Sequence, residues 1–218
     1  MPNWCENELT IRGDESDVAA CLAKIAGPLD EGTGQPLAIS FGQIVPMPLC
    51  LRGTESGSGA LMGAIIVGCA PDGVADHWLS YPWVQSEGVK TVEELQEFLR
   101  KRDTDGRAVA EAEKQRKAHR ETGHRDWYSW SIANWGTKWD ASSPNRIDKR
   151  EDGMACVRFD TAWSPPTPVI EVLGQQFPKL HLTLRYWEGG AAFKGRFVVR
   201  KGEVVDDQCG DYQGHRGG

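Results

Sequence analysis

The sequence predicts an α+β protein with a ferredoxin-like split β-α-β sandwich. Two observations support this fold class. Near each end of the chain, a strand pattern of alternating apolar residues precedes an amphipathic helix pattern and a second apolar segment. The stretch between these two β-α-β halves has a different, partly helical character and predicts a large insertion. We therefore expect an antiparallel sheet with both helices on one face, followed by a C-terminal hairpin.

The first half begins with a strand at residues 7–12, in which Leu9 and Ile11 face one way. Ser16 is predicted to cap the following helix. The apolar positions of that helix recur at helical spacing: Val18, Cys21, Leu22 and Ile25. After a loop, residues 38–44 predict a short second strand.

The second half begins with a strand at residues 154–163. Thr167 and Pro168 are typical of a helix start, with a capping hydroxyl followed by proline. An apolar stripe then follows: Val169, Ile170, Leu173 and Phe177. Residues 180–187 alternate again and predict a strand, and residues 197–205 predict the final hairpin.

We expect a single domain over residues 1–218. Its core is predicted at about 1–46 and 127–209, its insertion at about 47–126, and a flexible tail at 210–218. The composition, 39% hydrophobic and 26% charged, is globular. The net charge of −6 does not favour attraction to nucleic acid by the overall field. The longest apolar run falls short of the ~20 residues of a membrane helix, so we expect no membrane partner.

Within the insertion, the Gly- and Ser-rich residues 52–63 predict a loop, and Thr91–Glu94 predict a capping box that opens a helix. Residues 107–121 predict a polar helix. Residues 107–125 carry six basic and three acidic residues, the most basic part of the chain. This helix is either a solvated surface or a weak nucleic-acid contact. The candidate contact residues are Arg116, Lys117 and Arg120.

The sheet face opposite the helices is predicted to be mainly charged. It carries Glu8, Thr10, Arg12, Arg158, Asp160, His181, Thr183, Arg185 and Trp187. RNA-recognition modules of this fold have stacked aromatics on that face. Only one tryptophan is predicted here, so binding of single strands by this face is not favoured.

A tryptophan-rich segment ends in NWGTKWDASSP. Four tryptophans lie within thirteen residues, and Lys138 and Asp140 point the same way if the segment is extended. Two interpretations stay open. One is a salt-bridged polar layer under tryptophan packing. The other is a ligand site, in which burial would shift carboxylate pKa values. Its candidate residues are Trp135, Lys138, Asp140, Asp160, Trp163 and Glu188.

The cysteines and histidines show no metal-ligand spacing, and no CxxC pair occurs. We therefore expect no metal and no cofactor. The N-terminal residues lack the pattern of a secretory signal, which favours reduced thiols in a cytoplasm. The sequence shows no Ser-His-Asp or HExxH signature, so it gives no catalytic residue.

Several motifs resemble, in order, those of the YubB ferredoxin-like domain family, which includes an Api-type phage protein. They are NWCENELTIRG, FGQIVPMP, NWGTKWDA, FDTAWSPP, FPKLHLTLRYWEGG and FKGRF. The resemblance implies a split β-α-β fold; the name of the fold does not imply an iron–sulfur cluster, and the cysteine spacings argue against one. It also implies carriage on a phage, plasmid or other bacterial mobile element and residence in the cytoplasm of a bacterial host. It implies no activity.

The resulting hypothesis is a non-enzymatic binding or accessory protein that engages a host protein or a small polar ligand. One alternative is an enzyme or ligand-binding protein acting on a nucleotide-like metabolite at the Trp/Lys/Asp site. Another is weak nucleic-acid binding through the basic insertion helix. A nucleic-acid partner is the least favoured of these.

Overall fold

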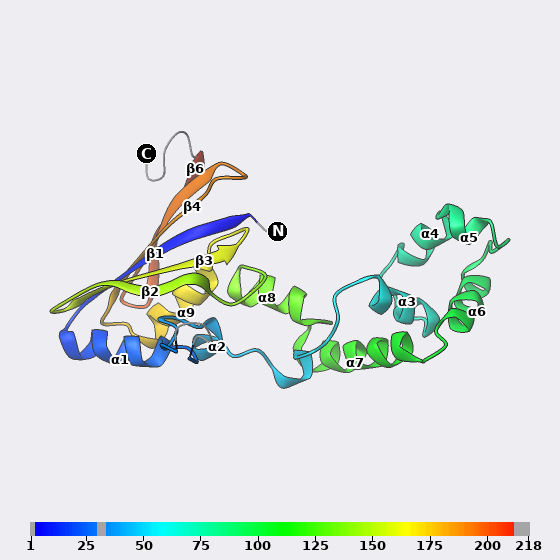
Figure 1. The fold of residues 1–218 in the computed structure, drawn as a ribbon, viewed down its shortest axis with the longest axis horizontal. Helices are drawn as coiled ribbons and strands as arrows, with labels where there is room; N and C mark the ends of the chain where they lie inside the picture. The colour runs from blue at the N-terminus through cyan, green and yellow to red at the C-terminus, as the bar shows by residue number, and fades with distance from the viewer. Residues whose placement is uncertain (1–2, 30–33, 212–218) are drawn as a thin grey trace. The chain divides into compact units, whose positions relative to one another are not determined.

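The computed structural model describes residues 3–29 and 34–211, which form two compact units (Figure 1). The sheet unit comprises Met1–Pro46 and Ser131–Gly218, and the helical unit comprises Met47–Trp130. Part of the predicted N-terminal loop (30–33) and most of the predicted tail (212–218) lie outside the described residues.

The sheet unit contains one six-stranded antiparallel sheet in the order β2-β3-β1-β4-β5-β6. Its strands are β1 (Trp4–Arg12), β2 (Ser142–Glu151), β3 (Met154–Ala162), β4 (His181–Glu188), β5 (Phe193–Arg200) and β6 (Glu203–Asp211). The first four, with two helices, form the split β-α-β sandwich. The β5–β6 hairpin then extends the sheet. The predicted fold class is confirmed.

Two helices, α1 (Glu15–Ile25) and α9 (Thr167–Gln176), lie on the same side of the sheet (Figure 1). Their apolar stripes are buried against the inward-facing residues of the strands, such as Leu9, Ile11 and Phe159, which are fully buried. Burial of these side chains is the main stabilising term of the sandwich.

Two local predictions in the first half are wrong. Residues 38–44 contain no strand. They contain the short helix α2 (Phe41–Ile44), whose two buried residues, Phe41 and Ile44, are three apart and so share a helical face. The N-cap of α1 is Asp14, and Ser16 lies inside the helix. The Asp14 side chain forms no capping hydrogen bond either.

The strand that completes the first half is β2, which comes after the insertion. Its residues, SSPNRIDKRE, are mostly exposed and follow no apolar alternation because β2 is an edge strand. The helical insertion is therefore joined to the sandwich between α1 and β2, inside the first β-α-β half, and its predicted position between the two halves is wrong.

The described part of the helical unit is built from helices that follow one another along the chain. They are η1 (Leu49–Leu51), α3 (Ser58–Ile66), α4 (Val74–Leu79), α5 (Pro82–Gln85), α6 (Val92–Arg102) and α7 (Arg107–Thr122), while α8 (Trp127–Trp135) continues into the sheet unit. The predicted helices at α6 and α7 are confirmed. Thr91 and Glu94 form the predicted capping box.

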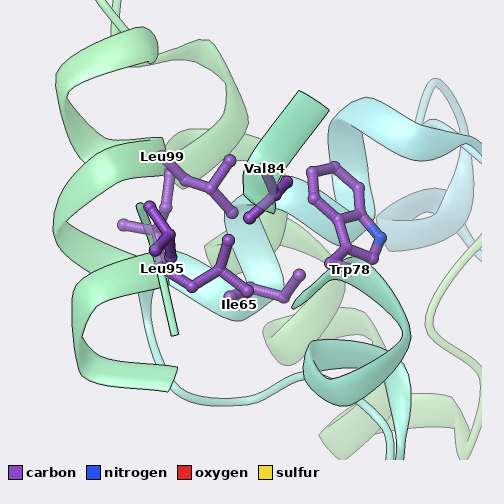
Figure 2. Close-up of a cluster of buried hydrophobic side chains, with 7 residues drawn as sticks. Ile65, Trp78, Val84, Leu95 and Leu99 are labelled. Carbon is purple, nitrogen blue, oxygen red and sulfur yellow. The ribbon is translucent and has the colours of Figure 1, made fainter. Parts of the chain in front are cut away.

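The helical unit has its own hydrophobic core. Figure 2 shows Ile65, Trp78, Val84, Leu95 and Leu99 packed together, and each is at most 8% exposed. These side chains come from four helices, α3 to α6. The predicted loop at residues 52–63 is wrong in its second part, since α3 begins at Ser58. Its apolar residues join this core, which outweighs the low helix propensity of its glycines.

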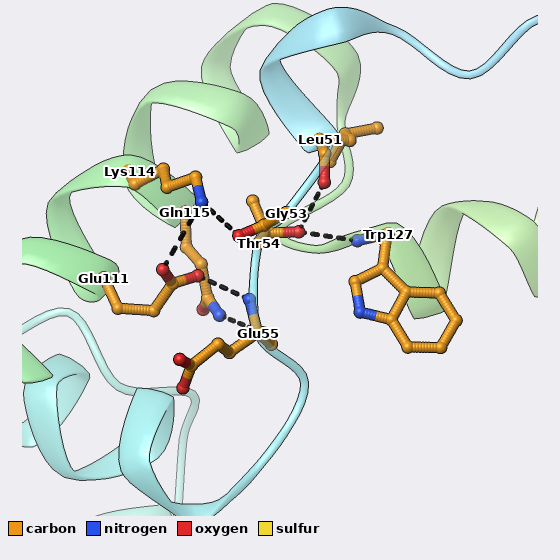
Figure 3. Close-up of polar contacts among 8 residues, drawn as sticks. All are labelled: Leu51, Gly53, Thr54, Glu55, Glu111, Lys114, Gln115 and Trp127. Carbon is orange, nitrogen blue, oxygen red and sulfur yellow. Dashed lines mark hydrogen bonds and ion pairs between the residues drawn. The ribbon is translucent and has the colours of Figure 1, made fainter.

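Polar contacts hold the segment before α3 against α7 (Figure 3). The Glu111 carboxylate accepts from the backbone N–H of Glu55 at 2.6 Å, and the Gln115 amide donates to the Glu55 carbonyl at 2.6 Å. The Thr54 hydroxyl accepts from the N–H of Trp127 at 2.9 Å. The polar face of α7 next to this segment therefore has a structural role.

Candidate functional site

Asp140, one of the predicted ligand residues, caps α2. Its carboxylate accepts hydrogen bonds from the Ser40 hydroxyl at 2.7 Å and from the backbone N–H groups of Phe41 at 2.6 Å and Gly42 at 3.3 Å. It also accepts from the N–H of Ala141 at 2.7 Å. A carboxylate at a helix N-terminus satisfies donors that the helix leaves open.

Trp135 and Glu188 are also held inside the chain. The Trp135 indole donates to the Val45 carbonyl at 2.9 Å and packs edge-on against Phe41. Glu188 is 2% exposed, and its carboxylate accepts from the N–H groups of Gly190, at 2.7 Å, and Ala191. Both residues therefore act in packing or turn capping.

Lys138 and Trp163 are brought together at one end of the sheet. The Lys138 ammonium lies 5.1 Å from the centre of the Trp163 ring and 4.6 Å from that of Trp139, both within cation–π range. Trp4 packs beside Trp139, with 6.3 Å between ring centres. All three indoles are about 40% exposed, so this cluster forms an aromatic patch on the surface.

Asp160 points away from Glu188. Asp160 is paired with Glu6 across β1 and β3, whereas Glu188 is paired with the buried Cys5 across β1 and β4. Adjacent positions of a strand face opposite sides of a sheet, so these carboxylates do not form an acid–base pair. Asp160 borders a hollow of about 220 Å³ together with Arg146. Desolvation there raises the pKa of Asp160 from 3.8 to about 6.

The raised pKa of Asp160 predicts that this residue lowers the free energy of unfolding in a pH-dependent way. The pKa of this carboxyl is 3.8 in the unfolded chain and about 6 in the folded chain. Below pH 3.8 the carboxyl is protonated in both states and does not lower the free energy of unfolding. As the pH rises through about 6, that stability is lost, because the unfolded chain ionises the group more readily. Asp160→Asn is expected to raise the free energy of unfolding by about 1 kcal/mol at pH 7.5, allowing for screening at this partly exposed site. No gain is expected at pH 3.5. Urea unfolding at both pH values checks this, with Asp152→Asn at an exposed turn as the control.

The three candidate nucleic-acid contacts lie on α7 in the helical unit. Arg116, Lys117 and Arg120 are exposed, on the side away from the buried Ala112, Gln115 and Ala118. They remain a predicted weak contact surface.

The open face of the sheet is arranged as the sequence predicts. Residues paired across neighbouring strands share a face, and Thr10 is paired with Thr183, as Glu8 is with Arg185. One line of paired residues crosses three strands: Arg12 on β1, His181 on β4 and Arg200 on β5. Cationic groups directly opposite one another destabilise a sheet unless something neutralises them.

His181 is held neutral in this line. The Arg200 guanidinium donates from Nε to Nε2 of His181 at 2.9 Å, so this nitrogen must carry no proton. Burial lowers the pKa of His181, and the positive charges of Arg200 and Arg12 lower it further.

The arginines of this face differ in their ionic partners. Arg158 lies 2.9 Å from Glu8 and 2.7 Å from Asp148, and Arg196 likewise has a carboxylate 2.7 Å away on β6. By contrast, three arginines form no ion pair with any residue that the structure describes: Arg12, Arg185 and Arg200.

A hollow of about 480 Å³ lies beside these unneutralised arginines. It is lined by Glu8, Thr10, Arg12, Lys149, Met154, Cys156, His181, Thr183 and Arg185. Two guanidinium groups, an ammonium and two hydroxyls give it many hydrogen-bond donors. The Lys149 ammonium is paired with Glu151 at 2.9 Å, and the Glu8 carboxylate accepts from Arg158. Guanidinium and hydroxyl donors of this kind suit oxygen atoms that carry negative charge.

The sequence predicts most of this face but omits Arg200 and Lys149. The position of Arg200 can be predicted once β5 is paired with β4, because this pairing places Arg200 opposite His181. Lys149 lies on β2, which has no apolar pattern to show its register.

Comparison with protein-family models gives a match to part of the chain. Residues 134–216 match the family model described as the ferredoxin-like domain in Api92-like protein. These residues make up less than half of the chain and are similar to that domain. The predicted resemblance to Api-type proteins is confirmed over these residues. The family description names a fold and no activity.

The matched Api92-like segment includes β2 to β6 and α9, while β1, which lies between β3 and β4, is outside it. A crystal structure of a protein api92 from Yersinia pseudotuberculosis is similar over 99% of this chain and 100% of the other, with 12% identity and a TM-score of 0.44. The search of curated proteins gave no match.

All six cysteines are free thiols, so no disulfide joins any of them. Among residues 3–29 and 34–211, no group of three or more His, Cys, Asp or Glu side chains is placed to hold a metal ion. In the same residues, every helix is too short or too polar to cross a membrane.

Proposed function

We propose that the chain is a non-enzymatic binding protein that takes a small polar anion on the open face of its sheet. The observation that carries this proposal is a set of arginines without an ion pair among the described residues: Arg12 and Arg185 line the 480 Å³ hollow, and Arg200 donates to His181, which also lines it. Its volume is in the range of small-molecule sites.

Binding without turnover fits the groups in this hollow. Cys156 is the residue there with nucleophilic potential, and desolvation raises its thiol pKa, which keeps it protonated and unreactive. The His181 nitrogen that would act as a base already accepts from Arg200. The guanidinium and hydroxyl groups of the lining are donors suited to holding oxygen atoms of phosphate or carboxylate.

We also propose that the chain serves a phage, plasmid or other mobile element in the cytoplasm of a bacterium. The support for this part is the resemblance of its motifs to proteins of enterobacterial plasmids and phages. The same proposal includes a protein of the bacterial host as a partner of the chain.

Calorimetric titration with inorganic tripolyphosphate at low salt tests the binding site. Wild-type protein is expected to bind, and Arg185→Gln is expected to weaken binding at least tenfold, because a charge-assisted hydrogen bond contributes about 1.5–3 kcal/mol. Arg150→Gln is the matched control, since Arg150 is paired with the inward-facing Ala155 and so lies on the other face. Absence of binding, or an equal loss in both variants, would contradict the proposal.

A further inference from the structure

A second hollow adjoins the anion site on the same face. It measures about 600 Å³ and shares Glu8 and Arg185 with the first. Its other lining residues include Trp187, Lys194, Arg196 and Gln208. Arg185 therefore stands between a hollow rich in cationic groups and a hollow that contains an indole.

The spacing along β4 sets the length of a ligand that would use both hollows. His181, Thr183, Arg185 and Trp187 alternate on the open face of this strand. Antiparallel strands rise about 3.4 Å per residue. An anion held over Thr183, between His181 and Arg185, would then lie ~14 Å along the strand from the position of Trp187.

The face changes character beyond Trp187. Trp187 is paired with Glu6, and Glu6 with Asp160, so the next side chains on this level are carboxylates. A long phosphate backbone crossing this part of the face would meet their negative charge. The chain as a whole also carries a net charge of −6. These features favour a discrete ligand over a nucleic-acid strand.

We propose, on the basis of the proposed function, that the ligand is a nucleoside polyphosphate. Its base stacks on Trp187 in the second hollow, and its phosphates lie among Arg12, His181 and Arg185 in the first. Glu8 borders both hollows and Gln208 borders the second, where a carboxylate and an amide can hydrogen-bond a ribose hydroxyl or the base edge.

The test compares ATP and GTP with inorganic tripolyphosphate, which carries the phosphates without a base. Calorimetry on the full chain is expected to show at least one nucleotide binding about tenfold tighter than tripolyphosphate, since stacking of a base on an aromatic ring contributes this much. Trp187→Leu is expected to remove the advantage and leave tripolyphosphate affinity unchanged. Trp187→Phe is expected to restore part of it.

Trp139→Leu is the matched control, because Trp139 is an exposed tryptophan of the same unit outside both hollows. It is expected to keep the full nucleotide advantage. Arg185→Gln is expected to weaken nucleotide and tripolyphosphate alike.

Two results would overturn this inference. If tripolyphosphate binds in an Arg185-dependent way but neither nucleotide binds tighter, the anion site stands and the nucleotide assignment is wrong. If a ten-residue single-stranded oligonucleotide binds tighter than both nucleotides, the ligand is a polymer. Failure of tripolyphosphate itself to bind would instead contradict the proposed function.

Discussion

Asp140→Ala is expected to lower the free energy of unfolding of the sheet unit by about 3 kcal/mol, because hydrogen bonds to charged groups contribute about 1.5–3 kcal/mol each. The carboxylate accepts four of them, from Ser40, Phe41, Gly42 and Ala141. Water molecules that accept hydrogen bonds from the same donors in the variant offset part of this loss. Urea unfolding followed by tryptophan fluorescence measures the change, and hydrogen exchange at α2 shows where it acts.

Two variants separate capping from ligand binding at this position. Asp140→Asn keeps one acceptor oxygen and is expected to fall between wild type and Asp140→Ala. Asp152→Ala removes an exposed acid from a turn and is expected to change stability by less than ~0.5 kcal/mol. An Asp140→Ala protein of wild-type stability would show that Asp140 is free to serve a ligand site instead.

Gly63→Ala is expected to destabilise the helical unit by about 3 kcal/mol, at the upper end of the cost of overpacking. A Cβ at Gly63 would lie 1.8 Å from the backbone oxygen of Ala108 and 3.1 Å from the Ala112 side chain. Because the nearest atom is backbone, α3 and α7 must move apart. Hydrogen exchange along both helices measures the loss of protection.

Gly59→Ala supplies the control in the same helix. A Cβ at Gly59 has only the flexible end of Glu55 within 4 Å, at 3.8 Å. Alanine also has the higher helix propensity. This variant is expected to be as stable as wild type or more so. Equal exchange in Gly63→Ala and wild type would mean that α3 and α7 do not approach this closely.

The parts of the fold with apolar periodicity are predictable from the sequence. β1, β3 and β4 alternate because one face is buried by α1 and α9, and α6 shows its capping box. β2 is not predictable in this way because an edge strand with both faces exposed needs no apolar residue. The start of α3 is hidden by glycines that permit its close contact with α7.

Part of the candidate site is likewise predictable from the sequence and part is not. Strand alternation alone places Arg12, His181 and Arg185 on one face. It does not reveal which arginines are neutralised, since the acid that engages Arg158 from β2 lies on the strand without a pattern. The tryptophan segment shows the reverse case. Its residues look chemically active in sequence, yet Asp140 and Trp135 are directed at the backbone of residues 41–45.

The protonation of His181 tests the anion site most directly. NMR titration of the imidazole, assigned with His181→Asn, is expected to show a pKa below its ordinary value in free protein, because burial, Arg200 and Arg12 all oppose its charge. Bound tripolyphosphate should raise that pKa by about one unit or more, since an opposite charge nearby favours the protonated form. Affinity should then increase as the pH falls.

The backbone amide signals of the helical unit are the internal reference and are expected to keep their positions when ligand binds. A rise in the pKa of His181 alone is the result predicted for an anion held beside Arg12, Arg185 and Arg200. Saturation with tripolyphosphate that leaves the pKa of His181 unchanged would contradict the proposed site.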